Sequence, residues 1–62
     1  MIHLIKLSVV MAMTGLSKSS IYAMMQAGSF PKTIHIGVRG VAWIEGEIQH
    51  WIEEKISQSR MA

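Results

Sequence analysis

The stretch from Thr14 to Tyr22, TGLSKSSIY, constrains the fold of this chain more than any other segment. Gly15 can end one helix in the left-handed conformation and Ser17 can cap the next, so only a tight turn separates the two predicted helices. The second helix opens with hydroxyl groups and Lys18, and it carries the tyrosine one turn further on. This arrangement is typical of a helix-turn-helix, in which the second helix is presented to DNA.

The length of the chain, 62 residues, predicts a single domain over residues 1–62. A domain of this size buries only about 60% of its unfolded surface, so its stability is expected to be marginal. The chain has no cysteine, which excludes disulfides and thiolate zinc sites and fits a cytoplasmic protein. Half of the residues are hydrophobic, too many for a disordered tail.

Helix and strand signals divide the chain into five elements. We expect helices near residues 9–14, with Ser8 as N-cap, near 18–27 and near 45–57. Residues 33–36 are β-branched and alternating, Gly37–Gly40 form a loop, and residues 41–43 return as a second strand, so the segment 33–43 predicts a β-hairpin. Residues 1–6 are expected to be a lead-in, and 58–62 a frayed end. The predicted fold class is mainly α with a small β-hairpin: a winged helix-turn-helix of the MerR/excisionase type with three helices.

Three apolar faces are expected to form the core. Val10 and Met13 lie three residues apart in the first helix, and the second helix presents Ile21, Met24 and Met25 at helical spacing. The last helix has the clearest stripe, which predicts a buried face made of Ile44, Ile48, Trp51, Ile52 and Ile56.

The apolar start of the chain is neither a signal peptide nor a membrane span. Its longest uninterrupted apolar run is Val9–Met13, below the roughly 7–15 residues that a signal peptide needs. No segment approaches the ~20 apolar residues of a transmembrane helix, so we expect no membrane partner.

Charge is unevenly distributed along the chain. Residues 1–44 contain lysine and arginine but no aspartate or glutamate, and every acidic residue lies between Glu45 and Glu54. A body with positive charge only suits a polyanionic partner. Charge alone fits equally well with cations that merely keep a small domain soluble.

Candidate DNA-contacting residues are polar, outward-facing side chains of the second helix and the hairpin. A helix N-terminus binds phosphate through its free N–H groups, and a cation at a hairpin tip can enter the minor groove or contact the backbone. The structural alternatives are a simple cap for Ser17, a half-buried core position for Tyr22, a strand's outward face for His35 and a solvated loop charge for Arg39. The predicted set is Ser17, Lys18, Ser19, Ser20, Tyr22, Gln26, Lys32, His35 and Arg39.

Other chemistry finds little support in the sequence. Glu47 and His50 form a Glu-x-x-His pair, but di-iron bundles need two such pairs and two further helix carboxylates. A chain this short also offers little room for a catalytic cleft. We therefore expect no metal, no cofactor and no enzymatic activity.

Several motifs together resemble the AlpA family of prophage regulators, which belongs with small excisionase-like and MerR-like winged-helix proteins. The resemblance covers residues 7–56 and rests on the segments VMAMTGLSKSSIY, GSFPK, IGVRGVAW and EIQHWI. It implies sequence-specific binding to double-stranded DNA, with transcription control or excision as the outcome. By position it also implies that residues 17–22 belong to the recognition helix and that Arg39 is the wing residue.

This chain departs from the resemblance in ways that keep alternatives open. Ala23, Gln26 and Ser29 stand where the family commonly carries charge, and Val9 stands where it is usually polar. We expect a transcriptional regulator of a prophage or mobile element, nucleoid-associated in a bacterial cytoplasm and able to self-associate on DNA. The alternatives are an excisionase-type directionality factor and, from another class, an adaptor that inhibits a regulator and binds a protein partner through the Val9 surface.

Overall fold

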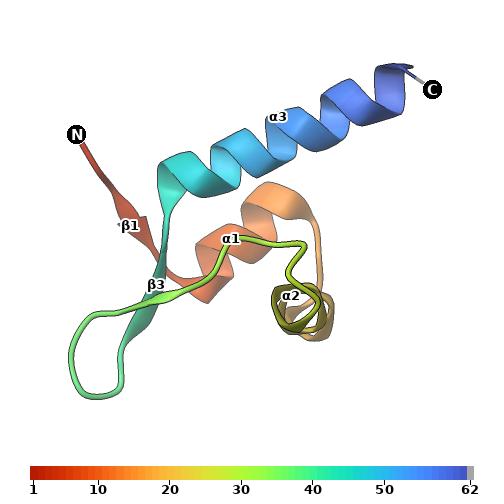
Figure 1. The fold of residues 1–62 in the computed structure, drawn as a ribbon. Coiled ribbons are helices and arrows are strands. Elements are labelled where there is room, and N and C mark those ends of the chain that lie inside the picture. Colours follow the sequence, from red (N-terminus) through yellow and green to blue (C-terminus); the bar gives the residue numbers. More distant parts are fainter. Residues whose placement is uncertain (62) are drawn as a thin grey trace.

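The computed structural model describes residues 1–61, in which three helices surround a small sheet (Figure 1). The sheet is antiparallel, with β3 between the two shorter strands in the order β1-β3-β2. This architecture confirms the predicted fold class and is consistent with a winged helix-turn-helix. The elements in chain order are β1 (Leu4–Ile5), α1 (Leu7–Thr14), α2 (Lys18–Gln26), β2 (Ile34–His35), β3 (Val41–Ile44) and α3 (Glu45–Met61).

The turn between α1 and α2 forms as its sequence predicts. Gly15 adopts a φ of 73°, and its N–H donates to the carbonyl of Met11 (2.8 Å), which closes the end of α1. The Thr14 hydroxyl donates to the Val10 carbonyl (2.8 Å) and accepts from the Leu16 N–H (3.2 Å), so both sides of the turn are held. The prediction that Ser8 caps α1 is wrong, because α1 begins earlier and its N-cap is Lys6, which makes no side-chain cap bond.

The end of α2 directs the chain back toward the sheet. Gly28 has a φ of 77°, and the N–H groups of Gly28 and Ser29 donate to the carbonyls of Met25 (3.1 Å) and Met24 (2.9 Å). This is the Schellman arrangement that satisfies the last carbonyls of a helix. Phe30 follows and is buried, so the segment before β2 is anchored on the core.

The core contains one buried residue from each helix, one from β3 and one from the segment between α2 and β2. Val10, Ile21, Phe30, Trp43 and Ile48 form a buried cluster that joins all three helices to β3. Trp43 has 0% exposed surface, whereas Trp51 is only half-buried. Trp51, expected on the buried face, is therefore only partly buried against the core: its ring packs on Phe30 (4.8 Å between centroids) and its Nε1 donates to the Ser29 carbonyl (2.8 Å).

Within the described residues, regular secondary structure extends further toward both ends than the predicted elements do. In the lead-in, Leu4 and Ile5 pair with Ile44 and Trp43 of β3, and the Glu45 N–H donates to the His3 carbonyl (2.9 Å). At the other end α3 continues through Met61, and Ala62 lies outside the described residues. Ile56, expected on the buried face, is exposed because α3 extends past the body it packs on. No helix within residues 1–61 is both long and apolar enough to cross a membrane.

Candidate nucleic-acid interface

Most of the predicted DNA-contacting residues lie on α2, whose opposite face holds it to the core. Ile21 is completely buried, and Met24 and Met25 are half-buried against the same cluster. The side of α2 away from these three residues is therefore exposed along its whole length. All the predicted residues at the N-cap and on α2 are exposed, namely Ser17, Lys18, Ser19, Ser20, Tyr22 and Gln26. Ser17 and Lys18 precede Ile21 by four and three residues, so they lie at the exposed start of the helix on the same side as Ile21 and not on the opposite side.

The start of α2 is capped by its own serines. The Ser17 Oγ accepts from the Ser20 N–H (3.2 Å), and the two hydroxyl groups are 3.0 Å apart within hydrogen-bonding geometry. The interpretation of Ser17 as an N-cap is thus confirmed. The cap satisfies the Ser20 N–H, while Lys18 and Ser19 remain exposed beside the positive end of the helix dipole.

Tyr22 combines the two roles that the sequence left open. Its ring meets the buried ring of Trp43 edge-on, with centroids 6.4 Å apart and planes at 62°. The residue is nevertheless 38% exposed, and its hydroxyl makes no hydrogen bond within residues 1–61. The ring is thereby fixed on the core while the hydroxyl remains available to a ligand.

Trp43 also brings Lys32 to the C-terminal half of α2. Its Nε1 donates to the Pro31 carbonyl (3.1 Å), which fixes the segment before β2. Lys32, Tyr22 and Gln26 consequently border one shallow depression of about 580 Å³. Two predicted residues of α2 and one of the segment before β2 thus lie around the same depression.

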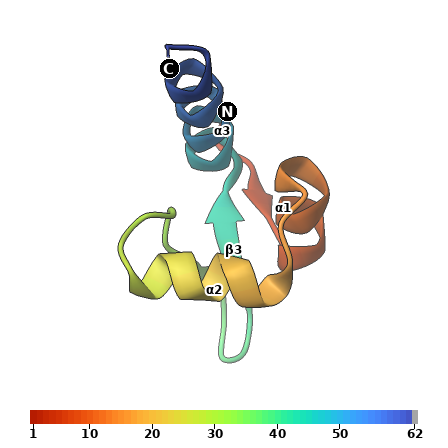
Figure 2. The same ribbon diagram turned by 90° about the vertical axis from the view of Figure 1, so that its right-hand side faces the viewer.

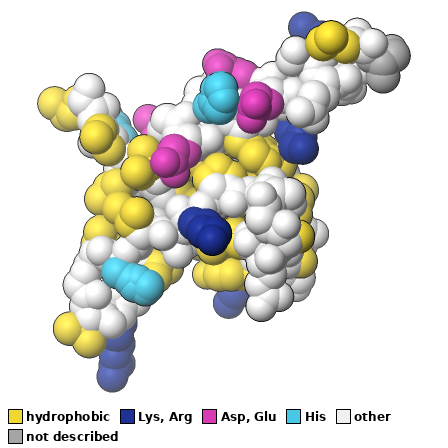
Figure 3. All heavy atoms as spheres, viewed as in Figure 1, with side chains coloured by type: hydrophobic (Ala, Val, Ile, Leu, Met, Phe, Trp, Pro, Cys, Tyr) yellow, Lys and Arg dark blue, Asp and Glu magenta, His cyan; other side chains and the backbone are white. Residues whose placement is uncertain are grey.

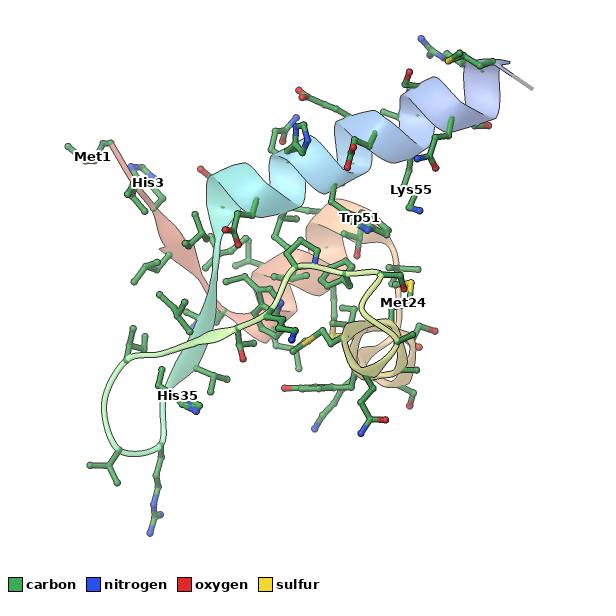
Figure 4. All side chains as sticks on the ribbon, in the orientation of Figure 1. Met1, His3, Met24, His35, Trp51 and Lys55 are labelled. Atoms are coloured by element: carbon green, nitrogen blue, oxygen red, sulfur yellow. The ribbon has the colours of Figure 1, made fainter. Side chains whose placement is uncertain are left out.

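The remaining predicted residues, His35 and Arg39, lie on the hairpin. Arg39 is in the three-residue tip, where Gly37 adopts a φ of 108° and the Ile36 N–H donates to the Gly40 carbonyl (2.9 Å). A Cβ at Gly40 would approach the Ile36 carbonyl oxygen to 2.8 Å, so this turn requires glycine there. His35 is exposed on β2 (Figure 4). The hairpin tip extends past α2 at the same end of the molecule, and α3 points the opposite way (Figure 2).

Within residues 1–61, most of these side chains have no hydrogen-bond or ion-pair partner. In the part of the chain that the structure describes, no side-chain hydrogen bond or ion pair involves the following residues, which are all exposed: Lys18, Ser19, Tyr22, Gln26, Lys32, His35 and Arg39. Forming contacts with a ligand would therefore break no side-chain hydrogen bond or ion pair of these groups.

The charges are separated in space as they are in sequence. Every acidic residue lies on α3, and on the face shown in Figure 3 the carboxylates gather over that helix. The part of this face formed by α2 and the hairpin shows lysine, arginine and histidine, and among these cations Lys32 also borders a hollow that Glu47 and Glu54 line. The end with α2 and the hairpin thus favours an anion.

A larger hollow than the depression beside Lys32 lies elsewhere on the surface. It measures about 1000 Å³ and runs between residues 28–34 and α3, with Glu47, His50 and Glu54 on its α3 side. Lys32 and Lys55 line the same hollow, so its charge is mixed, unlike that of the α2 N-terminus and the hairpin tip. Among residues 1–61, no group of three His, Cys, Asp or Glu side chains is placed to hold a metal ion.

The sequence reasoning missed two residues of this end. Trp43 positions both Tyr22 and the Lys32 segment, although only its place in an apolar strand after a glycine turn marked it. Val38, next to Arg39 in the hairpin tip, is fully exposed, which its apolar side chain did not indicate.

Comparisons with known proteins agree with this geometry. A family model described as "Prophage CP4-57 regulatory protein (AlpA)" matches residues 3–56. The DNA-binding transcriptional activator AlpA of Escherichia coli K12 is 32% identical over 60 residues, covering 87% of this chain and 86% of that protein. An uncharacterized protein, ORF88, of Enterobacteria phage P4 is 38% identical over 48 residues, covering 77% of this chain. That match spans only 54% of the phage protein, about half of its length.

Proposed function

We infer the function from a family relationship: the chain belongs to the AlpA family of prophage regulatory proteins. As a member it is a DNA-binding regulator of transcription, and we assign its site to α2 and the hairpin. One observation carries this assignment. The exposed polar face of α2 and the tip with Arg39 project at one end of the molecule, which carries cations and no carboxylate.

The proposed complex follows from the shape of this end. α2 enters the major groove of a DNA duplex, where its exposed side chains reach base edges and phosphates. Arg39 on the hairpin contacts the neighbouring backbone or minor groove. Lys32 lies beside the C-terminal half of α2 and adds a phosphate contact. The role is one of binding rather than catalysis, on the DNA of a prophage or other mobile element in a bacterial cytoplasm.

Selection from a library of random duplexes tests sequence specificity. We expect an enriched site that the protein binds at least about 10³-fold more tightly than non-specific DNA at the same salt concentration. Binding without any enriched site would contradict a sequence-specific regulator.

The same assay separates the alternative functions. A strong bend in the enriched site, measured by the mobility of circularly permuted fragments, would favour an excisionase-type factor. A folded protein that binds no duplex would favour an adaptor, whose partner would be sought at the exposed Val9 on α1.

A further inference from the structure

The apolar stripe of α3 ends at Ile56, which the described part of the chain leaves largely uncovered. The C-terminal turns of this helix extend away from the sheet and from α2 (Figures 1 and 2). Ile56 is 46% exposed and lies outside the core cluster, although it shares a helix face with the half-buried Ile52. A groove of about 460 Å³ runs along this face, with Met13 and Leu16 on its other side.

Two opposite charges flank the stripe on the same edge. Glu53 and Arg60 are seven residues apart, which is two helical turns with a drift of only about 20°. Glu53 accepts a long hydrogen bond from Gln49 (3.4 Å), and within residues 1–61 neither charge forms an ion pair. Nor does either have an opposite full charge three or four residues away in the helix, the spacing at which helix neighbours pair.

We propose that a second copy of this chain covers the stripe, with the two α3 helices antiparallel about a two-fold axis. An axis level with the midpoint of residues 56 and 57 places Glu53 of each copy opposite Arg60 of the other. Ile56 then lies at the centre of the contact. A parallel pair would instead bring Glu53 beside Glu53 and Arg60 beside Arg60, so the charges select the antiparallel direction.

The proposed contact between the two α3 helices is small, so we expect weak self-association. Residues 53–61 span about 13 Å of helix, so the buried area stays below the roughly 1,200 Å² of a stable interface. We expect a dissociation constant on the order of 0.1 mM in free solution. The pairing leaves α2 and the hairpin free, because they lie at the opposite end of the molecule.

Charge reversal in the full chain tests the pairing without any DNA, so its outcome is independent of the proposed function. Sedimentation equilibrium should show that Glu53→Arg and Arg60→Glu each weaken self-association about tenfold or more. The two-fold axis makes the exposed Glu53–Arg60 pair occur twice per dimer, so each substitution replaces two attractive pairs by two repulsive ones. An equimolar mixture of the two variants should recover the wild-type level, since arginines at 53 and 60 then face glutamates. Glu54→Arg is the matched control: it changes the net charge equally on the opposite face of α3 and should leave self-association unchanged.

Circular dichroism of each variant shows whether it remains folded, which is expected because these side chains are exposed. A wild-type chain that stays monomeric up to about 1 mM would overturn the proposal. Equal weakening by Glu54→Arg, or a mixture that fails to recover, would overturn the antiparallel arrangement.

Discussion

The end formed by α2 and the hairpin differs from the C-terminal half of α3, although both are exposed. The first is built on a fully buried tryptophan, Trp43, and carries polar groups and positive charge. The second is an apolar stripe flanked by charges of both signs and held to the body only at its base. A fixed surface of one charge suits a polyanion, whereas a self-complementary stripe suits a copy of itself.

The largest expected effect is the loss of stability on replacing Trp43, which supports the first region, compared with Trp51, which packs beneath the second. Trp43→Ala should lower the free energy of unfolding by about 3–5 kcal/mol, because the side chain is fully buried and its N–H is bonded. Trp51→Ala should cost less, about 1–3 kcal/mol, since that side chain is only partly buried although its N–H is bonded too. Urea denaturation followed by circular dichroism measures both. Equal losses of unfolding free energy in the two variants would show that Trp51 stabilises the fold as much as Trp43 does, which contradicts this comparison.

Charge removal should affect DNA binding at one end only. Lys18→Ala and Arg39→Ala should each weaken binding to all duplexes about tenfold, or about 1.4 kcal/mol, and reduce the salt slope by about one. Lys55→Ala is the control at the other region, because Lys55 lies over the Trp51 ring (5.4 Å to the centroid; Figure 4). Fluorescence anisotropy with labelled duplexes measures all three. If Arg39 enters a narrow minor groove, its loss should be greatest at A·T-rich sites.

The local signals of the first region explain why it could be predicted from sequence. Gly15, Ser17 and Gly28 act through their own backbone conformation or hydrogen bonds to near neighbours, so their residue types identify them. The outward face of α2 then followed from the buried position of Ile21. The hairpin followed from the Gly37–Gly40 turn for the same reason.

The missed features depend on contacts between distant segments. β1 has only two residues, and nothing near Leu4 specifies its pairing with Ile44. β3 is the central strand and buries the adjacent Ala42 and Trp43, and its central position depends on the pairing with β1 that the sequence did not indicate. The stripe of α3 is longer than the body beneath it, which is why its periodicity predicted burial for Trp51 and Ile56 beyond what the fold supplies.

A smaller effect is expected from the cap that opens α2. Ser17→Ala should lower the free energy of unfolding by about 1 kcal/mol, because the Ser20 N–H loses its acceptor. Ser19→Ala removes a neighbouring hydroxyl that caps nothing and should leave stability unchanged. Thermal or urea unfolding that shows the same loss for both variants would argue against the cap as the source of the effect.

The smallest change concerns one hydroxyl group. Tyr22→Phe keeps the ring contact with Trp43, so the free energy of unfolding should stay at the wild-type value. Binding to the selected duplex should weaken by about 0.5–1.5 kcal/mol if the hydroxyl contacts DNA. Titration calorimetry combined with urea unfolding separates the two. A lower free energy of unfolding with unchanged DNA affinity would show that the Tyr22 hydroxyl serves stability only and does not contact DNA.

The central claim, that the end with α2 and the hairpin binds the DNA backbone, is tested most directly by the salt dependence of duplex binding. Three to five phosphate contacts per chain should give a slope of log K against log salt concentration of about −3 to −5. This slope should persist in Glu53→Arg and Arg60→Glu after allowance for self-association, because these residues lie at the other end. A flat salt dependence, or no binding by a folded sample at low salt, would contradict the account.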